Sequence, residues 1–177
     1  MRKLKVTELN RLDVEQFKAS VKTPLAVVLD DVRSMHNVGS VFRTADAFRA
    51  EVVCLCGITS CPPQAEIHKT ALGAEDSVEW THYGNALEAV EALHVAGFEV
   101  YALEQVEGSI SLNDFVPLKG KKYAIVLGNE VKGVAQEVVD ACDGALEIPQ
   151  FGTKHSLNVS VSGGIAIWHF AKSLLGL

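Results

Sequence analysis

Short apolar segments alternate with longer segments of mixed polarity along most of this chain. In the longer segments apolar residues recur every three or four positions, as they do on one face of a helix. Strands that alternate with helices in this way are typical of α/β domains with a parallel sheet. We therefore predict an α/β fold with a mainly parallel sheet flanked by helices, whose strands cover Leu25–Leu29, Val52–Leu55, Val100–Leu103, Ala124–Leu127 and Ala145–Ile148.

Two of the predicted helices have recognisable start or stop signals. Residues Asn85 to Ala96 begin with a residue type that is favoured as an N-cap, and Gly97 follows them as a stop. A leading helix is predicted from Thr7 to Ala19, before the Thr23-Pro24 step into the first strand. The apolar side of the leading helix would carry Leu9, Leu12 and Phe17, and that of the later helix Leu87, Val90 and Leu93.

A third helix is predicted near residues 37–48, and it carries an arginine that core packing does not explain. On a helix, Arg43 points away from the apolar stripe, so it is either a solvated surface residue or a functional one. Asn37 directly precedes the apolar periodicity and is a natural N-cap. The apolar stripe consists of Val38, Val41, Phe42, Ala45 and Phe48.

Glycines and polar residues follow the later strands at their carboxyl ends, where ligands collect in open α/β sheets. Gly128 follows the strand Tyr123–Leu127, and its missing side chain would let a cofactor approach the backbone closely. Glu130 stands at the same strand end. Farther on, Ser156 can cap a helix that begins near Leu157. This helix also carries small residues that would let another helix or backbone pack closely against it: Ser160, Ser162, Gly163 and Gly164.

Composition and charge fit one globular domain with a basic start. The chain has 177 residues, of which 48% are hydrophobic and 21% charged, with no signal-peptide pattern and no apolar run of membrane-spanning length. We therefore expect a soluble, cytoplasmic protein. The net charge is −6, but residues 1–22 hold six Lys/Arg and three Asp/Glu, so this segment carries +3 and the remainder −9. The basic segment either contacts phosphate or is an ordinary solvated helix.

The cysteines and the common nucleotide-binding patterns exclude several chemistries. Cys54, Cys56, Cys61 and Cys142 show no paired spacing and are expected to be reduced, mostly buried thiols. A metal site made by the first three with His68 is disfavoured because the spacing fits no common zinc pattern, so we expect no metal. Phosphate-binding glycine loops and the hydrolase G-x-S-x-G turn are also absent from the sequence. Neither nucleotide binding of those kinds nor acyl transfer is indicated.

Three segments together resemble the motifs of the SpoU-type (TrmH-like) RNA ribose 2′-O-methyltransferases of the SPOUT superfamily. They run from Asn37 to Phe48, from Ile125 to Val134 and from Ile148 to Gly164. Their order and spacing are those of the family, and the resemblance extends over about residues 24 to 175. A chance match of all three is much less probable than a chance match of one.

The resemblance implies a particular fold, cofactor and set of partners. It implies a methyltransferase domain over residues 24–177 with a C-terminal deep trefoil knot at about residues 123–160, preceded by a basic helical extension over residues 1–23. The cofactor would be S-adenosylmethionine, the substrate tRNA or rRNA, and the enzyme a homodimer formed through the knot region. By motif position the cofactor would contact Gly128, Ile148 and Leu157, with Leu103 and Ser156 as weaker candidates.

The same resemblance assigns roles in methyl transfer to a ribose 2′-hydroxyl. Arg43 matches the arginine that has been proposed as general base in this family. A guanidinium, with a pKa of roughly 12 or more, is normally a permanent cation, so acting as a base requires unusual help from a neighbouring residue or an RNA phosphate. We therefore expect Arg43 to orient the ribose and the adjoining phosphate and to accept the proton late in the transfer. Arg43, the knot loops and the substrate would be held in place by Asn37, Glu130, Ser156 and Asn158.

Two alternatives belong to other functional classes. One is a non-catalytic RNA-binding dimer that keeps the knot, although the presence of all the matched polar residues argues against it. The other, suggested only by the acidic charge, is a small-molecule enzyme on an α/β sheet. Many family members carry an extra N-terminal RNA-binding domain, which we do not expect here, so we expect RNA recognition by residues 1–22, the dimer surface and the terminal helix.

Overall fold

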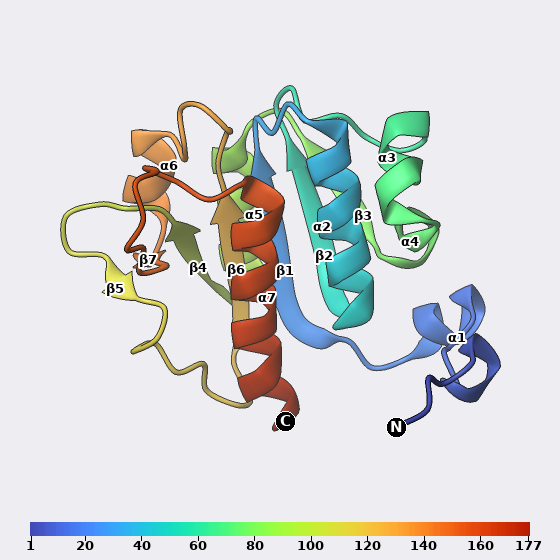
Figure 1. Cartoon of the computed structure of the whole chain (residues 1–177). Coiled ribbons are helices and arrows are strands. Elements are labelled where there is room, and N and C mark those ends of the chain that lie inside the picture. Colours follow the sequence, from blue (N-terminus) through green and yellow to red (C-terminus); the bar gives the residue numbers. More distant parts are fainter.

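The fold is built on one sheet whose strands all run in the same direction (Figure 1). The computed structural model describes residues 1–177, except for the side chain of Val6. The strands lie in the order β3-β2-β1-β6-β4-β7-β5, and each pairing between them is parallel. The strands are β1 (Thr23–Asp30), β2 (Ala50–Cys56), β3 (Trp80–Tyr83), β4 (Phe98–Leu103), β5 (Ile110–Ser111), β6 (Lys122–Leu127) and β7 (Gly144–Glu147). The helices are the 3₁₀ helix η1 (Val6–Glu8) and the α-helices α1 (Val14–Ala19), α2 (Met35–Ala47), α3 (Ala65–Ala71), α4 (Ala74–Ser77), α5 (Ala86–Val95), α6 (Gln136–Ala141) and α7 (Val159–Leu175).

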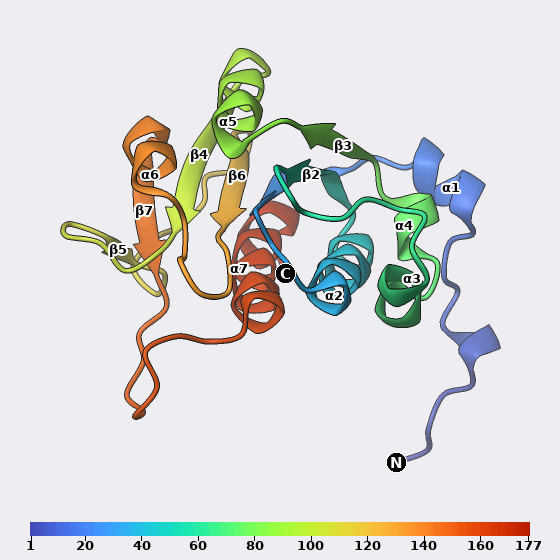
Figure 2. The same ribbon diagram turned by 90° about the horizontal axis from the view of Figure 1, so that it is seen from above.

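Helices cover both faces of the sheet (Figure 2). α2 and α7 lie on one face, and α5 and α6 lie on the other. Strand β1 packs against both layers: Leu25, Val27 and Leu29 belong to the core with α2 and α7, whereas Ala26 and Val28 belong to the core with α5. A strand that is buried on both faces has a nearly continuous apolar sequence, which is why the sequence alone predicted this strand.

The predicted α/β fold and its parallel sheet are confirmed. All five predicted strands are present, and β7 is displaced by one residue toward the N-terminus. Sequence reasoning missed β3 and β5, which lie at the two edges of the sheet and contain no buried residue. Short, polar edge strands lack the apolar run that identifies a central strand.

The predicted leading helix over residues 7–19 is wrong as a single element. The chain forms η1 and then α1, and Asn10 between them adopts a left-handed conformation with φ of 47°. Asp13 starts α1, because its side chain accepts a hydrogen bond from the backbone N–H of Gln16, and the Gln16 side chain accepts one from the backbone N–H of Asp13. This capping box begins a new helix inside the predicted one. Of the predicted apolar side, Phe17 is buried, whereas Leu9 and Leu12 are exposed.

The helix predicted after Asn85 is confirmed as α5. The Asn85 side chain accepts a hydrogen bond from the backbone N–H of Glu88 at 3.0 Å, and Gly97 beyond the helix end has φ of 84°. Val90 and Leu93 are buried, as the periodicity predicts. No helix among the described residues has both the length and the apolar composition that crossing a membrane would require.

The C-terminal helix α7 also contacts the loop that precedes β6. The imidazole Nε2 of His169 lies 2.6 Å from the carbonyl oxygen of Phe115. The rings of Phe115, Tyr123 and Phe170 form an aromatic cluster with centroids 5.4 to 6.0 Å apart. These contacts fix α7 against both the sheet and the loop. The trefoil knot over residues 123–160 stays a prediction.

Candidate functional site

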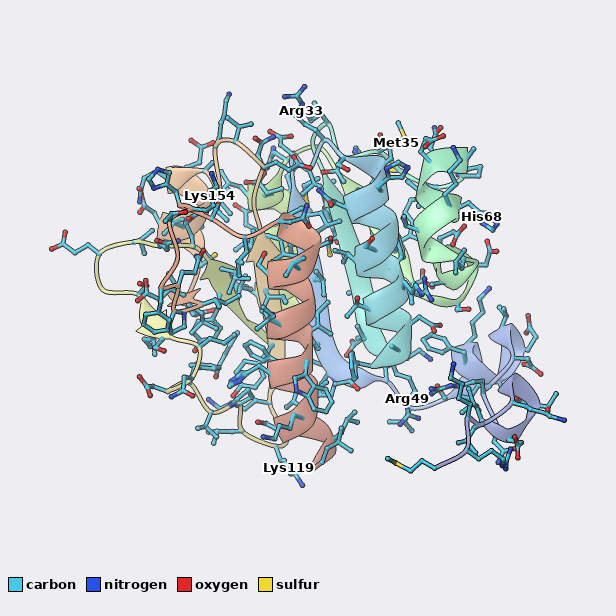
Figure 3. All side chains as sticks on the ribbon, in the orientation of Figure 1. Arg33, Met35, Arg49, His68, Lys119 and Lys154 are labelled. Carbon is cyan, nitrogen blue, oxygen red and sulfur yellow. The ribbon has the colours of Figure 1, made fainter. Side chains whose placement is uncertain are left out.

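The carboxyl ends of the strands meet at one edge of the sheet, the upper edge in Figure 1. Figure 3 places Arg33 and Lys154 at this edge, whereas Arg49 and Lys119 lie at the opposite one. In open parallel sheets, ligands bind beyond the carboxyl ends of the strands. The loops that carry the three sequence motifs leave the strands at this edge.

A cleft of about 680 Å³ opens among the loops that follow β4, β6 and β7. This volume lies within the roughly 300–1,000 Å³ that is typical of small-molecule sites. All five residues that were predicted to contact a cofactor line it: Leu103, Gly128, Ile148, Ser156 and Leu157. The structure therefore brings together residues that are up to 54 positions apart in the sequence.

The cleft wall is acidic, with three carboxylates and one lysine. Sequence reasoning missed Glu104, although a carboxylate directly after a predicted strand is a usable signal. The Glu104 carboxylate accepts hydrogen bonds from the backbone N–H groups of Gln105 and Val134, each at 2.9 Å. It therefore ties the end of β4 to the loop after β6. The other two carboxylates are those of Glu130 and Glu147, and the lysine is Lys132.

Gly128 also has a structural reason for its missing side chain, which the sequence did not indicate. A Cβ atom added there would meet the carbonyl carbon of Gly133 at 2.1 Å and the nitrogen of Val134 at 2.2 Å. The backbone that approaches Gly128 is therefore the chain's own loop, which Asn129 and Gly133 close through two backbone hydrogen bonds of 3.0 and 2.9 Å. Gly128 lets the loop after β6 fold back on itself, and this loop forms part of the cleft wall.

Glu130 joins the first two motifs through three hydrogen bonds. Its Oε2 accepts from the backbone N–H of Arg33 at 3.0 Å, and its Oε1 accepts from the backbone N–H of Ser34 at 2.9 Å and from Nδ2 of Asn37 at 3.1 Å. Partial burial opposes ionisation, but the hydrogen bonds outweigh it and lower the pKa of Glu130 below its usual value. Glu130 is therefore an ionised, fixed carboxylate at neutral pH.

Asn37 is not the N-cap of α2, although capping was one of the two interpretations of this residue. Ser34 is the N-cap, and its hydroxyl oxygen accepts from the backbone N–H of Asn37 at 3.3 Å. Since the helix begins at Met35, Asn37 lies in its first turn with a buried side chain. That side chain donates to Glu130, and its Oδ1 accepts from Nδ2 of Asn158 at 3.2 Å. Asn37 thus links the second and third motifs.

Asn158, and not Ser156, caps the last helix. The Asn158 Oδ1 accepts from the backbone N–H of Ser160 at 2.9 Å, and α7 begins at Val159, two residues later than predicted. Ser156 is exposed and lines the cleft. Because Ser and Asn are both favoured N-caps, residue type alone does not choose between them. Through Asn158 the third motif joins the hydrogen-bond network around Glu130.

Arg43 lies apart from this network. The apolar stripe of α2 is buried and Arg43 is exposed, as predicted. Arg43 is six residues beyond Asn37, which corresponds to about 9 Å along a helix. It lines a separate groove of about 460 Å³ between α2 and α3. Within the described part of the chain, its guanidinium forms no hydrogen bond or ion pair with another residue. The structure therefore places Glu130, Ser156 and Asn158 in the cleft wall and Asn37 behind it, bonded to Glu130 and Asn158, but it does not bring Arg43 there.

The cysteines act as packing residues. Cys54 and Cys56 are free, buried thiols, as predicted, whereas Cys61 and Cys142 are partly buried. Burial raises the pKa of Cys54 to about 12, so this thiol is protonated and unreactive at neutral pH. No group of His, Cys, Asp and Glu side chains in the described structure is arranged to hold a metal ion.

Comparison with known proteins identifies the family. The SpoU rRNA Methylase family matches residues 24–168, a range that holds the cleft, the network around Glu130 and the groove beside Arg43. The chain belongs to the SpoU rRNA methylase family. Its three motifs are therefore family motifs, and the structure shows how hydrogen bonds connect them.

Relatives of the chain include proteins named for both rRNA and tRNA. The 23S rRNA (guanosine-2′-O-)-methyltransferase RlmB of Vibrio parahaemolyticus is 32% identical over 168 residues, which cover 95% of this chain and 67% of the relative. An AdoMet-bound rRNA methyltransferase from Sinorhizobium meliloti has a TM-score of 0.78 at 27% identity, over 88% of this chain and 59% of that one. A structure described as giving insights into the 2-OH methylation of C/U34 on tRNA has a TM-score of 0.75 at 26% identity, and the match covers 86% of this chain and 97% of that one. The chain thus spans about two thirds of the RlmB relative and less of the Sinorhizobium protein.

Proposed function

We propose that this chain transfers a methyl group from S-adenosylmethionine to a ribose 2′-hydroxyl of RNA. Membership of the SpoU family and the names of the relatives, which act on 23S rRNA or on tRNA, support the reaction and the substrate class. The observation that carries the proposal is the network of Glu130, Asn37 and Asn158. It connects all three family motifs beside one cleft of cofactor size.

The cleft has the chemistry that S-adenosylmethionine requires. When bound, this cofactor supplies a methyl group activated by a positively charged sulfur. Leu103, Ile148 and Leu157 provide apolar surface for its adenosine, and the backbone around Gly128 and Ser156 provides hydrogen-bonding groups. The excess of carboxylates over cations in the cleft wall favours a positively charged ligand.

Positioning supplies most of the proposed catalysis. Methyl transfer breaks a carbon–sulfur bond, forms a carbon–oxygen bond and releases the hydroxyl proton, without a covalent bond to the protein. Alignment of the reacting groups can lower such a barrier by about 7–11 kcal/mol. In this proposal Glu130, Asn37 and Asn158 hold the loops of the cleft in place, and Arg43 orients the ribose and the adjoining phosphate.

We also propose a homodimer formed through the outer face of α7. Val161, Gly164, Ile165 and Trp168 recur at helical spacing, and Ile165 and Trp168 are 41% and 45% exposed. A Cβ atom added at Gly164 would meet nothing within 4 Å, so this glycine leaves room for a second helix. Since α2 packs beside α7, a partner on this face would lie next to α2, the helix that carries Arg43 (Figure 2).

The remaining expectations concern RNA recognition and location. We propose that the basic extension over residues 1–23 adds phosphate contacts to the domain of residues 24–177, and that the enzyme acts in the cytoplasm. A non-catalytic RNA-binding dimer is the alternative function. Because it would keep the fold and the RNA affinity, only a measurement of methyl transfer separates the two.

The deciding experiment measures transfer of a labelled methyl group from S-adenosylmethionine to separate pools of unmodified tRNA and rRNA. Mass spectrometry of the nucleosides then identifies the modified atom. Label on a ribose 2′-oxygen is expected and would name the RNA class. Absence of label in both pools, from folded protein that binds the cofactor, would favour the non-catalytic binder.

The proposed dimer is tested with Ile165→Asp, which places a charge at the centre of the exposed face of α7. We expect this variant to sediment as a monomer. Val95→Asp introduces the same charge at an exposed apolar residue of α5, on the other face of the sheet, and should not change the mass. If the two variants sedimented with the same mass, that result would contradict the proposed interface.

A further inference from the structure

The groove between α2 and α3 has the opposite charge to the cofactor cleft. Two cations, Arg43 and Lys69, and three hydroxyl residues line it, with no carboxylate among the described lining residues. This is unusual for the molecule, because residues 23–177 carry a net charge of −9. The hydroxyl residues are Ser40, Thr44 and Thr70, and an apolar end is formed by Ala47 and Phe48.

The groove exists because α2 and α3 approach each other closely. A Cβ atom added at Gly39 would meet the carbonyl oxygen of Ile67 and the Oγ1 of Thr70, each at 2.2 Å. The Thr70 hydroxyl also donates a hydrogen bond to the carbonyl oxygen of His36 at 2.9 Å. These contacts fix α3 in place, and with it Lys69, which neighbours Thr70 and shares the groove with Arg43.

The cations, rather than the hydroxyl groups, are available to bind an anion in this groove. The Ser40 hydroxyl donates to the carbonyl oxygen of His36 at 2.8 Å, and the Thr44 hydroxyl donates to the carbonyl oxygen of Ser40 at 3.0 Å. Since each hydroxyl has one proton, these groups face the groove as acceptors. Acceptors suit the hydroxyls of a ribose, whereas the two cations suit a phosphate.

Lys69 is held only by an exposed carboxylate. Its Nζ lies 2.5 Å from Oε1 of Glu66 on the same helix, and the other Glu66 oxygen lies 2.9 Å from Nε2 of His36. The side chains of Lys69 and Glu66 are 62% and 45% exposed, and ion pairs of this kind are weak in water. A phosphate in the groove can therefore compete with Glu66 for Lys69.

We propose that this groove binds the phosphodiester backbone of the RNA beside the nucleotide to be methylated, and that Lys69 is a positioning residue for the substrate. The inference rests on the proposed function, because Arg43 in the same groove is assigned to the target ribose. The phosphate next to that ribose would pair with Arg43, and a neighbouring phosphate would pair with Lys69.

The test compares Lys69→Gln with Glu66→Gln in binding of a fluorescein-labelled pool of unmodified tRNA, without cofactor. Lys69→Gln should weaken RNA binding about fivefold at 0.1 M salt, because it removes one phosphate contact. The plot of log affinity against log salt concentration should therefore become less steep, by about 0.7–0.9. Glu66→Gln should strengthen binding, since it frees Lys69 and removes a negative charge. Lys119→Gln, at an exposed lysine on the opposite edge of the sheet (Figure 3), is the matched control and should leave affinity and slope unchanged.

Opposite effects of the two variants separate phosphate binding from a structural role. If the Lys69–Glu66 pair only stabilised α3, breaking it from either side would weaken RNA binding alike, and that result would overturn the proposal. A loss of RNA affinity in Lys119→Gln equal to that in Lys69→Gln would also overturn it. In methyl-transfer assays Lys69→Gln should raise the KM for RNA and leave kcat and cofactor affinity unchanged. Because RNA binding is measured without transfer, wild-type protein that binds through the groove but transfers no methyl group would refute only the proposed function.

Discussion

The cofactor cleft and the groove beside Arg43 use polar residues in opposite ways. At the cleft, Glu130, Asn37 and Asn158 bond to one another or to backbone N–H groups, and the wall carries more carboxylates than cations. In the groove, Arg43 is exposed and has no hydrogen-bond or ion-pair partner among the described residues, and the lining is basic. Side chains whose bonds are satisfied internally hold loops in place, whereas an unpaired cation is available to the substrate. This difference supports the proposals that the cofactor binds in the cleft and that the RNA contacts the groove.

The largest expected effect is that of removing the guanidinium from the groove. Arg43→Ala should lower kcat for methyl transfer by about 10²-fold or more, because a misplaced reacting group costs about that much. Cofactor affinity, measured by calorimetry, should not change, since Arg43 does not line the cleft. Arg43→Lys keeps the charge without the planar fork and should restore only part of the rate. Near-normal transfer by Arg43→Ala would contradict the assignment.

The next largest effect concerns the backbone of the cleft. Gly128→Ala should lower the free energy of unfolding by about 1–3 kcal/mol, because its Cβ would overlap the loop backbone at Gly133. Cofactor affinity should fall with it, as the loop forms part of the cleft wall. Gly152→Ala is the control, since an added Cβ meets nothing within 4 Å there. Chemical unfolding and calorimetry measure both quantities, and equal results for the two variants would rule out this role of Gly128.

A third comparison separates helix capping from the network. Asn158→Ala and Asn85→Ala each remove an N-cap hydrogen bond, and each should destabilise the protein by about 1 kcal/mol. Only Asn158→Ala also removes the bond to Asn37, so it alone should reduce methyl transfer. Loss of activity in both variants would show that reduced stability, rather than the network, explains the effect.

The smallest expected effect is the pH dependence of stability that comes from Glu130. The folded state lowers the pKa of this carboxyl from its usual 4.5. The stabilisation is therefore complete above about pH 4.5 and is lost as the pH falls through the lower folded value. It should be modest, because the carboxylate is exposed. Unfolding free energies from pH 6 to pH 3 should fall less steeply for Glu130→Gln than for wild type; identical slopes would show that Glu130 does not contribute.

Local sequence signals identified elements that are buried on both faces or capped by one clear residue. They found the five central strands and α5 because continuous apolar runs and an N-cap with a following glycine are short-range features. They failed where two residues competed for one role. The N-cap of α2 is Ser34 and not Asn37, and the N-cap of α7 is Asn158 and not Ser156. In each pair both residue types are favoured N-caps, so residue type alone does not predict which of the two caps the helix.

The sequence by itself determined the class of fold, the family motifs and five of the residues that line the cleft, because apolar periodicity and motif spacing are properties of the chain. Only the tertiary structure decided how the motifs work together. Asn37 is 93 residues from Glu130 and 121 residues from Asn158, so no local pattern predicts that their side chains bond. The place of Arg43 beside Lys69 likewise depends on how closely α3 packs against Gly39. Hydrogen bonds and charges act over a few ångströms, and folding alone sets which residues come within that distance.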